Sequence, residues 1–222
     1  MNRYSLIGLT LCSLAAAQVA TEVNKRYQTP EGRAAIATTL NDPHRDDRQK
    51  PKELVAALGL KPGMGVADIG TGTGYMLPFL SEAAGKKGRV FGEDIFDDFL
   101  KQAAERVAQN KLENVKLVKG TEHSVNLPAG SVDVVMILDA YHHFDFPGDM
   151  LASISQGLKA GGRLAIVDFY RRPEAMPNGN AMQHIRLDAD DVIKEVEGFG
   201  FHFVEKKEQI PNSQYVAIFT KK

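Results

Sequence analysis

The sequence has no tryptophan, a single cysteine and almost no net charge. One cysteine excludes an internal disulfide framework and any zinc site that is built from several thiolates. The 27 basic residues nearly balance the 28 acidic ones, and the formal net charge of −1 gives no long-range attraction for nucleic acid. The hydrophobic content of 43% is ordinary for a globular chain, so the 222 residues suffice for one full domain with a short appendage.

Residues 1–17 differ from the rest of the chain. The stretch from Tyr4 to Ala20 carries no charge, and its apolar centre runs into Ala15-Ala16-Ala17. A basic start, a short apolar run and a small-residue site are typical of a secretory signal peptide, so we expect a periplasmic or secreted protein. Cleavage there would also remove the lone Cys12. The alternative is an uncleaved apolar anchor on a membrane-tethered or cytoplasmic protein.

Short apolar runs alternate with helical patterns along the rest of the chain. Strands are predicted at 65–69, 89–91, 115–118, 132–138, 163–167, 201–206 and 215–219. Helices are predicted at 51–58, 74–84, 97–109, 147–158 and 190–197. Strands that alternate with helices in this way are typical of a parallel sheet that helices cover on both faces. We therefore predict a doubly wound α/β domain over 51–222, preceded by a helical cap or lid over 18–50.

A glycine-rich loop follows the first predicted strand. It runs from Gly70 to Gly74 in the spacing G-x-G-x-G, with Asp68 two residues before the first glycine. A dinucleotide site needs G-x-G-x-x-G, and an acid at this place would repel a pyrophosphate, whereas it suits a ligand with an ammonium group. The next strand ends at Asp94, where a carboxylate can accept two hydrogen bonds from a ribose diol. The two features together predict a ligand site at this edge of the sheet.

Several ordered motifs resemble those of class I S-adenosylmethionine-dependent methyltransferases. They are Asp68–Gly74, Asp94, Leu127–Asp133 and Leu158–Leu164, and Tyr141-His142-His143-Phe144 is similar to a segment of the small-molecule branch. The resemblance covers roughly residue 50 to the C-terminus. It implies a Rossmann-like, seven-stranded sheet with a reversed terminal strand, S-adenosylmethionine as the cofactor, and methyl transfer to a small-molecule acceptor by in-line displacement.

The resemblance also implies a set of cofactor-binding residues. It places Asp68 near the methionine ammonium, Asp94 on the ribose hydroxyls and Ile95 against the adenine. Thr121 occupies the position of an acid that many family members use for the adenine amino group, so this contact is assigned to Glu122. The predicted cofactor-binding residues are Asp68, Gly70, Thr71, Gly72, Gly74, Asp94, Ile95, Glu122 and Asp139.

The segment after the fourth strand supplies the predicted catalytic residues. Because the cofactor carries the electrophile, the protein must mainly align the nucleophile and remove its proton. Imidazole titrates near neutrality, so His142 and His143 are candidates for the general base, with packing in the core as the alternative for each. Tyr141 is expected to shape the pocket near the methyl group, unless it is a packed aromatic at the strand end.

Two further expectations concern metals and the N-terminal cap. Asp139 and Asp168 stand at neighbouring strand ends, as in metal-dependent O-methyltransferases, but Phe169 replaces the amide residue of those enzymes. We therefore predict no metal site. Arg48 and Gln49 precede the sheet and are candidates for the cofactor's carboxylate or for a lid, with an ordinary charged helix start as the alternative.

Two other function classes remain open at the level of sequence. One is a nicotinamide-dependent oxidoreductase on a Rossmann domain, and the other is a cofactor-binding protein without turnover. The composition favours a small-molecule partner, and the apolar N-terminal segment leaves membrane association open.

Overall fold

The computed structural model describes residues 20–177 and 179–221. The predicted signal peptide or anchor at 1–17, with Cys12, lies outside these described residues. Within the described part of the chain, every helix is too short or too polar to cross a lipid bilayer.

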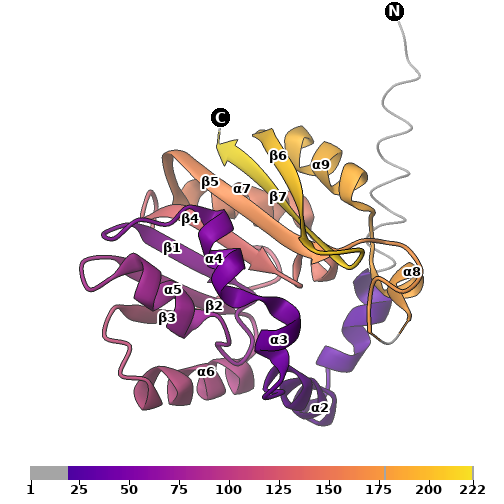
Figure 1. Cartoon of the computed structure of the whole chain (residues 1–222), viewed down its shortest axis with the longest axis horizontal. Coiled ribbons are helices and arrows are strands. Elements are labelled where there is room, and N and C mark those ends of the chain that lie inside the picture. Colours follow the sequence, from indigo (N-terminus) through magenta and orange to yellow (C-terminus); the bar gives the residue numbers. More distant parts are fainter. Residues whose placement is uncertain (1–19, 178, 222) are drawn as a thin grey trace, which may run out of the picture.

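The centre of the fold is a seven-stranded sheet in the order β3-β2-β1-β4-β5-β7-β6 (Figure 1). Strands β1 to β5 pair in parallel, whereas β7 runs antiparallel to both β5 and β6. The predicted doubly wound sheet with a reversed terminal strand is therefore confirmed. The strands are β1 (Gly65–Ile69), β2 (Arg89–Asp94), β3 (Val115–Lys119), β4 (Val132–Leu138), β5 (Leu158–Phe169), β6 (Phe201–Ile210) and β7 (Gln214–Lys221).

Helices cover both faces of this sheet (Figure 1). One face is packed by α4 (Pro51–Leu58), α5 (Leu77–Ala84) and α6 (Asp97–Gln109). The other is packed by α7 (Pro147–Gly157) and α9 (Ala189–Gly198). This two-sided cover is what buried parallel strands require, because neither face of such a sheet can be left in water.

The alternation of side chains along β4 shows how the two layers are built. Val134 and Met136 belong to the apolar cluster under α4, α5 and α6, whereas Val135 and Ile137 belong to the cluster under α7 and α9. All four are buried. Successive side chains of a strand point to opposite faces, so one continuous apolar run supplies two cores.

Several element boundaries differ from the sequence-based prediction, among them the starts of β5 and α5 and the end of β6, which extends to Ile210 rather than 206. β5 begins at Leu158 rather than at 163, because Leu158 already pairs with Val132 before the register of the two strands shifts. The helix that was expected from Gly74 begins at Leu77, because the residues before it form a turn in which Leu77 N donates to Gly74 O. The glycine loop is therefore longer than its sequence spacing suggested.

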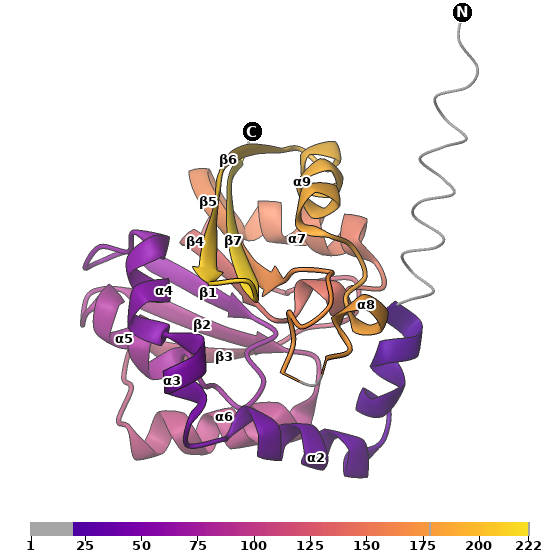
Figure 2. The ribbon, with the colours of Figure 1, turned by 45° about the vertical axis from the view of Figure 1, so that its right-hand side comes forward.

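Short helices from the N-terminal part gather beside the carboxyl ends of the strands (Figure 2). They are η1 (Lys25–Tyr27), α2 (Pro30–Leu40) and α3 (Arg45–Gln49). A fourth short helix, α8 (Ala181–His184), comes from the segment between β5 and α9 and lies on the same side (Figure 2). These segments cover the edge of the sheet at which the predicted site residues stand.

Polar bonds attach the N-terminal helices to the sheet layer. Arg33 Nε lies 2.6 Å from Asp98 Oδ2 and so ties α2 to α6. Asn24 Nδ2 donates to Asp145 Oδ2 over 3.0 Å and so ties the residues before η1 to the segment after β4. The N-terminal helices are thus fixed to both halves of the sheet.

Candidate functional site

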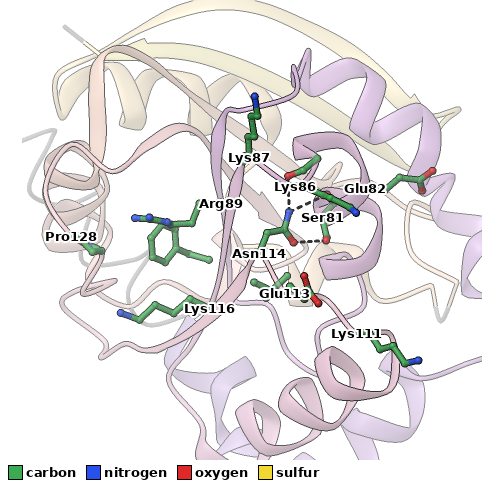
Figure 3. Close-up of a pocket in the computed structure, with 14 residues that line it drawn as sticks. Ser81, Glu82, Lys86, Lys87, Arg89, Lys111, Glu113, Asn114, Lys116 and Pro128 are labelled. Atoms are coloured by element: carbon green, nitrogen blue, oxygen red, sulfur yellow. Dashed lines mark hydrogen bonds between the residues drawn. The ribbon is translucent and has the colours of Figure 1, made fainter.

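Among the described residues, two hollows lie at opposite ends of the parallel strands. The larger, about 940 Å³, is a depression at the amino ends of β2 and β3, with Asn114 bound to Ser81 and Gly85 at its wall (Figure 3). Its lysines point in different directions, away from one another (Figure 3). Ligands of open α/β sheets bind at the carboxyl ends of the strands, so the geometry favours the second hollow, a cavity of about 230 Å³.

The glycine loop forms one wall of this carboxyl-edge cavity. Gly70 and Gly72 have φ values of 70° and 55°, in the left-handed region that favours glycine. A Cβ on Gly70 would lie 2.7 Å from the Cβ of Ala140, and one on Gly72 would lie 2.9 Å from Cδ1 of Leu40. The loop therefore brings bare backbone to the cavity at two positions where a side chain does not fit.

Two buried carboxyls hold this loop in place. Thr71 Oγ1 donates to Asp68 Oδ2 over 2.7 Å, and burial raises the pKa of Asp68 to about 7. Asp94 accepts from the backbone N–H of Gly72 at 2.9 Å and from that of Phe96 at 3.0 Å. Burial raises the pKa of Asp94 to about 6, although these backbone hydrogen bonds oppose the rise. A carboxylate oxygen can accept more than one hydrogen bond, so Asp94, which lines the cavity, can also accept from a ligand.

Asp139, which is half-buried, adds a third carboxyl directly after β4. Its φ of 52° turns the chain sharply, and its Oδ1 accepts from Gln214 Nε2 over 2.6 Å. Burial, with the nearby Asp168, raises the pKa of Asp139 to about 7. The positive charge of Arg45 opposes the rise in the pKa of both Asp139 and Asp68. The guanidinium carbon of Arg45 lies 4.0 Å from the ring centre of Tyr75.

Most of the predicted cofactor residues line the cavity. Asp68 and Gly74 do not, because Asp68 is buried beneath the loop and Gly74 packs against Leu77 and Ala103. The predicted residues that do line it are Gly70, Thr71, Gly72, Asp94, Ile95, Glu122, Asp139 and His143.

The N-terminal segment contributes in a different way from the one predicted. Arg48 bonds Asp42 and Gln49 bonds Gln214, so neither of them lines the cavity. Arg45, three residues before Arg48 on α3, is the one that does. Sequence could not choose among these polar residues, because which face of a five-residue helix meets the sheet depends on tertiary packing. Gln49 contacts the site only indirectly, because its partner Gln214 donates a hydrogen bond to Asp139.

Glu93 is a site residue that the sequence analysis did not single out. It is 1% exposed, and its Oε2 accepts from Gly70 N over 3.3 Å, while no hydrogen-bond partner is found for its Oε1 among the described residues. Burial and the neighbouring Asp94 raise the pKa of Glu93 well above its usual value. A Cβ on Gly120 would lie 1.6 Å from this Oε1, so Gly120 makes room for the carboxyl. The sequence signal that could have identified Glu93 is its place beside Asp94, as one of two adjacent acids at the end of a strand.

The two histidines of η2 (Tyr141–His143) have different environments. His142 is buried, with its Nδ1 2.7 Å from Asp168 Oδ1, and it does not line the cavity. His143 does, with its Nδ1 2.7 Å from Asn24 Oδ1 and its Nε2 3.3 Å from the Tyr27 hydroxyl. Burial lowers the pKa of His143 well below its usual value, so its imidazole is neutral at pH 7.

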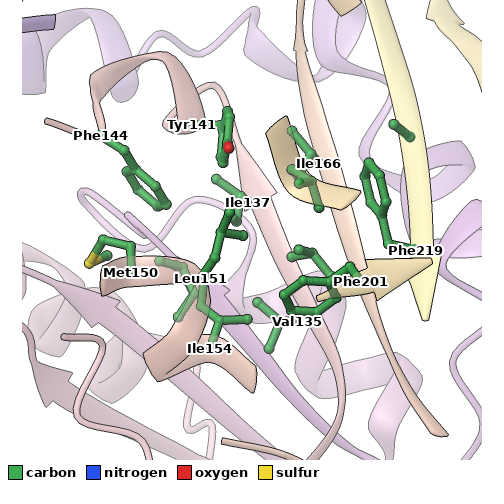
Figure 4. Close-up of a cluster of buried hydrophobic side chains, with 14 of the residues drawn as sticks. Val135, Ile137, Tyr141, Phe144, Met150, Leu151, Ile154, Ile166, Phe201 and Phe219 are labelled. Carbon is green, nitrogen blue, oxygen red and sulfur yellow. The ribbon is translucent and has the colours of Figure 1, made fainter. Parts of the chain in front are cut away.

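Tyr141 takes the packed position that was the alternative to shaping the pocket. It lies in the buried apolar cluster with Ile137 and Phe144 (Figure 4). Its hydroxyl donates to Glu195 Oε1 over 2.7 Å. Glu195 also pairs with Arg186, at 2.5 and 2.9 Å. The ring is therefore a packed aromatic with a satisfied hydroxyl, and it does not shape the wall of the cavity, because the turn after β4 aims it into the core.

The fold and this site define the class of protein. A sheet in the order 3-2-1-4-5-7-6, with a glycine loop after β1 and an acid at the end of β2, is the architecture of class I methyltransferases. Residues 67–166 match the family described as "Methyltransferase domain". With the fold, this match identifies residues 67–166 as a methyltransferase domain of the class I type, a family whose cofactor is S-adenosylmethionine, and the oxidoreductase alternative is set aside.

Similar proteins support this assignment. The chain is 30% identical over 125 residues to a ubiquinone/menaquinone biosynthesis C-methyltransferase of Marinomonas sp., a match that covers 56% of this chain and 49% of the relative. It is 30% identical over 117 residues to a demethylmenaquinone methyltransferase of Listeria monocytogenes, covering 53% and 49%. The crystal structure of a SAM-dependent methyltransferase from Aquifex aeolicus superposes with a TM-score of 0.77 at 25% identity, covering 85% of this chain and 98% of that one. The matches span about half the length of the curated relatives.

Proposed function

We propose that the protein transfers the methyl group of S-adenosylmethionine to a small, largely apolar acceptor with an aromatic or quinol-like ring. The observation that carries this proposal is the make-up of the cavity, which joins a cofactor end to an apolar end. The glycine loop and the buried acids form the cofactor end. The apolar end is lined by the side chains of Tyr27, Phe96, Phe99, Leu138, Phe144 and Met150. The names of the curated relatives, which concern quinones, point to the same acceptor chemistry.

The residues at the cofactor end fit S-adenosylmethionine. Gly70 and Gly72 leave room for close approach to the backbone, as a cofactor chain requires. The free lone pairs of Asp94 suit the two ribose hydroxyls. Asp139, which lines the cavity, and the buried Asp68 behind the loop give a negative field for a ligand with an ammonium and a sulfonium group. The guanidinium of Arg45 is the matching donor for the carboxylate of the methionine moiety.

The cofactor supplies an activated methyl group, so the chain's own residues need to orient the acceptor and handle its proton. His143 is suited to both tasks because it lines the cavity and its neutral imidazole carries a lone pair. The aromatic and aliphatic walls exclude water and hold a flat ring in position, and orientation alone contributes roughly 7–11 kcal/mol to such reactions.

The first test measures cofactor binding by titration calorimetry. Wild-type protein should bind S-adenosylmethionine, and Asp94→Ala should weaken binding roughly 100-fold, because two hydrogen bonds to a charged group are lost. Asp97→Ala removes an exposed carboxylate that pairs with Lys119 and serves as the control with unchanged affinity. Circular dichroism checks that the variants are folded. A wild-type protein that does not bind S-adenosylmethionine would overturn the proposal.

The second test measures methyl transfer from labelled S-adenosylmethionine to a panel of phenols, hydroquinones and aliphatic alcohols. Wild-type protein should label the ring compounds preferentially. His143→Ala should lower kcat by roughly 100-fold or more, as expected for loss of a positioned base, while its cofactor affinity stays close to wild type. The exposed His202 on β6 gives the control variant His202→Ala. Equal turnover in the two variants would remove His143 from the mechanism.

A further inference from the structure

Three histidines from two distant segments meet beside the cavity. His142 and His143 belong to η2, and His184 ends α8. One ring nitrogen of each lies within 4.8 Å of the corresponding nitrogens of the other two. The ring centres are 4.1 Å apart for His142 and His143, 4.9 Å for His142 and His184, and 5.3 Å for His143 and His184. Proximity in sequence accounts for the contact between His142 and His143, but not for the presence of His184, which comes from α8.

The hydrogen bonds behind His142 fix which of its nitrogens is free. Asp168 Oδ1 lies 2.7 Å from Nδ1 of His142, and Asp168 Oδ2 accepts from the backbone N–H of the same residue. An ionised carboxylate only accepts, so Nδ1 carries the proton and Nε2 carries the lone pair. A carboxylate behind an imidazole is the arrangement that orients histidines which bind metal ions.

The same argument applies to His143, through an amide. Asn24 Nδ2 donates to His143 O at 2.9 Å and to Asp145 Oδ2 at 3.0 Å, which fixes Asn24 Oδ1 as an acceptor. Nδ1 of His143, at 2.7 Å from this oxygen, therefore carries the proton and Nε2 carries the lone pair. The contact of that Nε2 is the Tyr27 hydroxyl at 3.3 Å, a long hydrogen bond that an ion can replace.

An acidic residue also lies directly against the cluster. The carboxylate of Asp168 supplies a negative charge next to the cluster, opposite in sign to a cation.

We propose that His142, His143 and His184 bind one divalent transition-metal ion, with zinc as the first candidate. Imidazole suits zinc, copper, iron and nickel, and three histidines with an open fourth position form a known type of zinc site. Zn–N bonds of about 2.0–2.1 Å put the nitrogens roughly 3.4 Å apart, so the rings must close by about 1 Å. His184 stands on a four-residue helix and is partly exposed, so it is the ring best placed to move.

This site differs from the oxygen-ligated one considered from the sequence. Asp168 is bound to His142, and Asp139 accepts from Gln214, so these two carboxylates act as supports rather than as a magnesium pair. Because His143 lines the cavity, an ion held by it lies at the cavity's edge. In a step that rests on the proposed function, the fourth position would hold the acceptor's oxygen, whose pKa a zinc ion lowers. With the ion bound, the contact between the ion and the acceptor's oxygen would replace the direct contact between His143 and the acceptor.

The experiment titrates chelator-treated protein with Zn²⁺ alone, in competition with a chromophoric chelator. We expect one ion per chain. His184→Ala should weaken binding at least about 100-fold, and Asn24→Ala should weaken it about 10- to 100-fold through loss of the support behind His143. His202→Ala should bind as wild type does. Co²⁺ in place of Zn²⁺ should give the visible absorption of a tetrahedral site in the wild type and not in His184→Ala.

Binding of less than half an equivalent, or equal affinity in wild type and His184→Ala, would overturn the inference. The rings would then be a hydrogen-bonded aromatic cluster. Circular dichroism confirms folding, and Asn24→Ala leaves all three ligands in place if His184→Ala does not fold. S-adenosylmethionine binding is measured on the same samples without metal. If zinc does not bind but the cofactor does, only the metal site is overturned. If the cofactor does not bind, the proposed function is overturned.

Discussion

The two ends of the sheet carry charge in opposite ways. At the carboxyl ends, the pKa values of four carboxyls are raised mainly by burial: Asp68, Glu93, Asp94 and Asp139. The first three are at most 5% exposed. At the amino ends, the larger hollow is edged by Lys86, Lys87 and Lys116, which are exposed or partly exposed. Water screens the exposed lysines, whereas burial of like charges costs free energy that a protein tolerates mainly at functional sites. The size of a hollow is therefore a poorer guide than the desolvation of its charges.

The sharpest way to test this comparison is a pair of glycine substitutions. Gly70→Ala adds a Cβ 2.7 Å from that of Ala140 and also places alanine at a φ of 70°. Gly161→Ala has a similar φ of 69°, but nothing lies within 4 Å of the added atom. Both variants carry the conformational cost of roughly 1–2 kcal/mol, but only the first distorts the cavity.

We expect Gly70→Ala to lose at least 100-fold in cofactor affinity and Gly161→Ala to keep it, as measured by titration calorimetry. Chemical denaturation of each variant checks that the shared strain lowers stability by a similar amount. Similar losses of affinity in both variants would mean that backbone strain, not space at the loop, controls binding.

The second test is the pH dependence of the free protein. In the folded chain the pKa values of Asp68 and Asp139 are raised from 3.8 to about 7. The folded state thus holds these protons more tightly than the unfolded state does, and this contribution to stability is full below pH 4 and lost as the pH rises through 7. These two groups lower the free energy of unfolding between pH 4 and 7, by an amount on the order of a few kcal/mol.

Cofactor binding should change in the opposite direction. The cationic groups of S-adenosylmethionine favour ionised carboxylates, so affinity should rise from pH 5 to pH 8 while the stability of the free protein falls. Thermal unfolding and titration at the two pH values measure both trends, and Asp139→Asn should flatten each of them. Parallel trends in stability and affinity would contradict the assigned role of these acids.

The smallest effect is expected at the amino-end depression. Lys87→Ala combined with Lys116→Ala removes two of the charges around this hollow. Since exposed charges contribute little, both the affinity for S-adenosylmethionine and the free energy of unfolding should stay within about 1 kcal/mol of wild type. A larger fall in affinity, measured at low salt, would make the amino end part of the site.

Much of the fold followed from patterns along the chain. The alternation of short apolar runs with helical segments predicted the doubly wound sheet, and the boundaries of α6 and β4 agree with the structure. The boundaries that shifted, at Leu158 and Leu77, depend on pairing and turn bonds between residues that periodicity does not describe. Periodicity identifies which face of an element is apolar, but it does not reveal where pairing begins.

The residues of the candidate site also divide into those that the sequence could predict and those that it could not. Gly70, Gly72 and Asp94 were predictable because a loop between a strand and a helix imposes its own backbone geometry, wherever the rest of the chain lies. Glu93 was missed, since strand alternation assigns it to the face opposite Asp94 and only the glycine at Gly120 makes room for its side chain. The sequence could not decide between the two alternatives for Tyr141, because its partner, Glu195, lies 54 residues further along the chain.

The sequence by itself determined the class of fold, the edge of the sheet that holds the candidate site and the loop that lines its cavity, because each depends on interactions between near neighbours in the chain. Only the tertiary structure decided that Arg45 rather than Arg48 lines the cavity, that Asn24 and Tyr27 contact His143, and that His184 joins the other two histidines. These contacts connect segments far apart in the sequence. Their residues became functional candidates only once packing had buried them together, since desolvation and fixed hydrogen-bond partners are properties of the folded state.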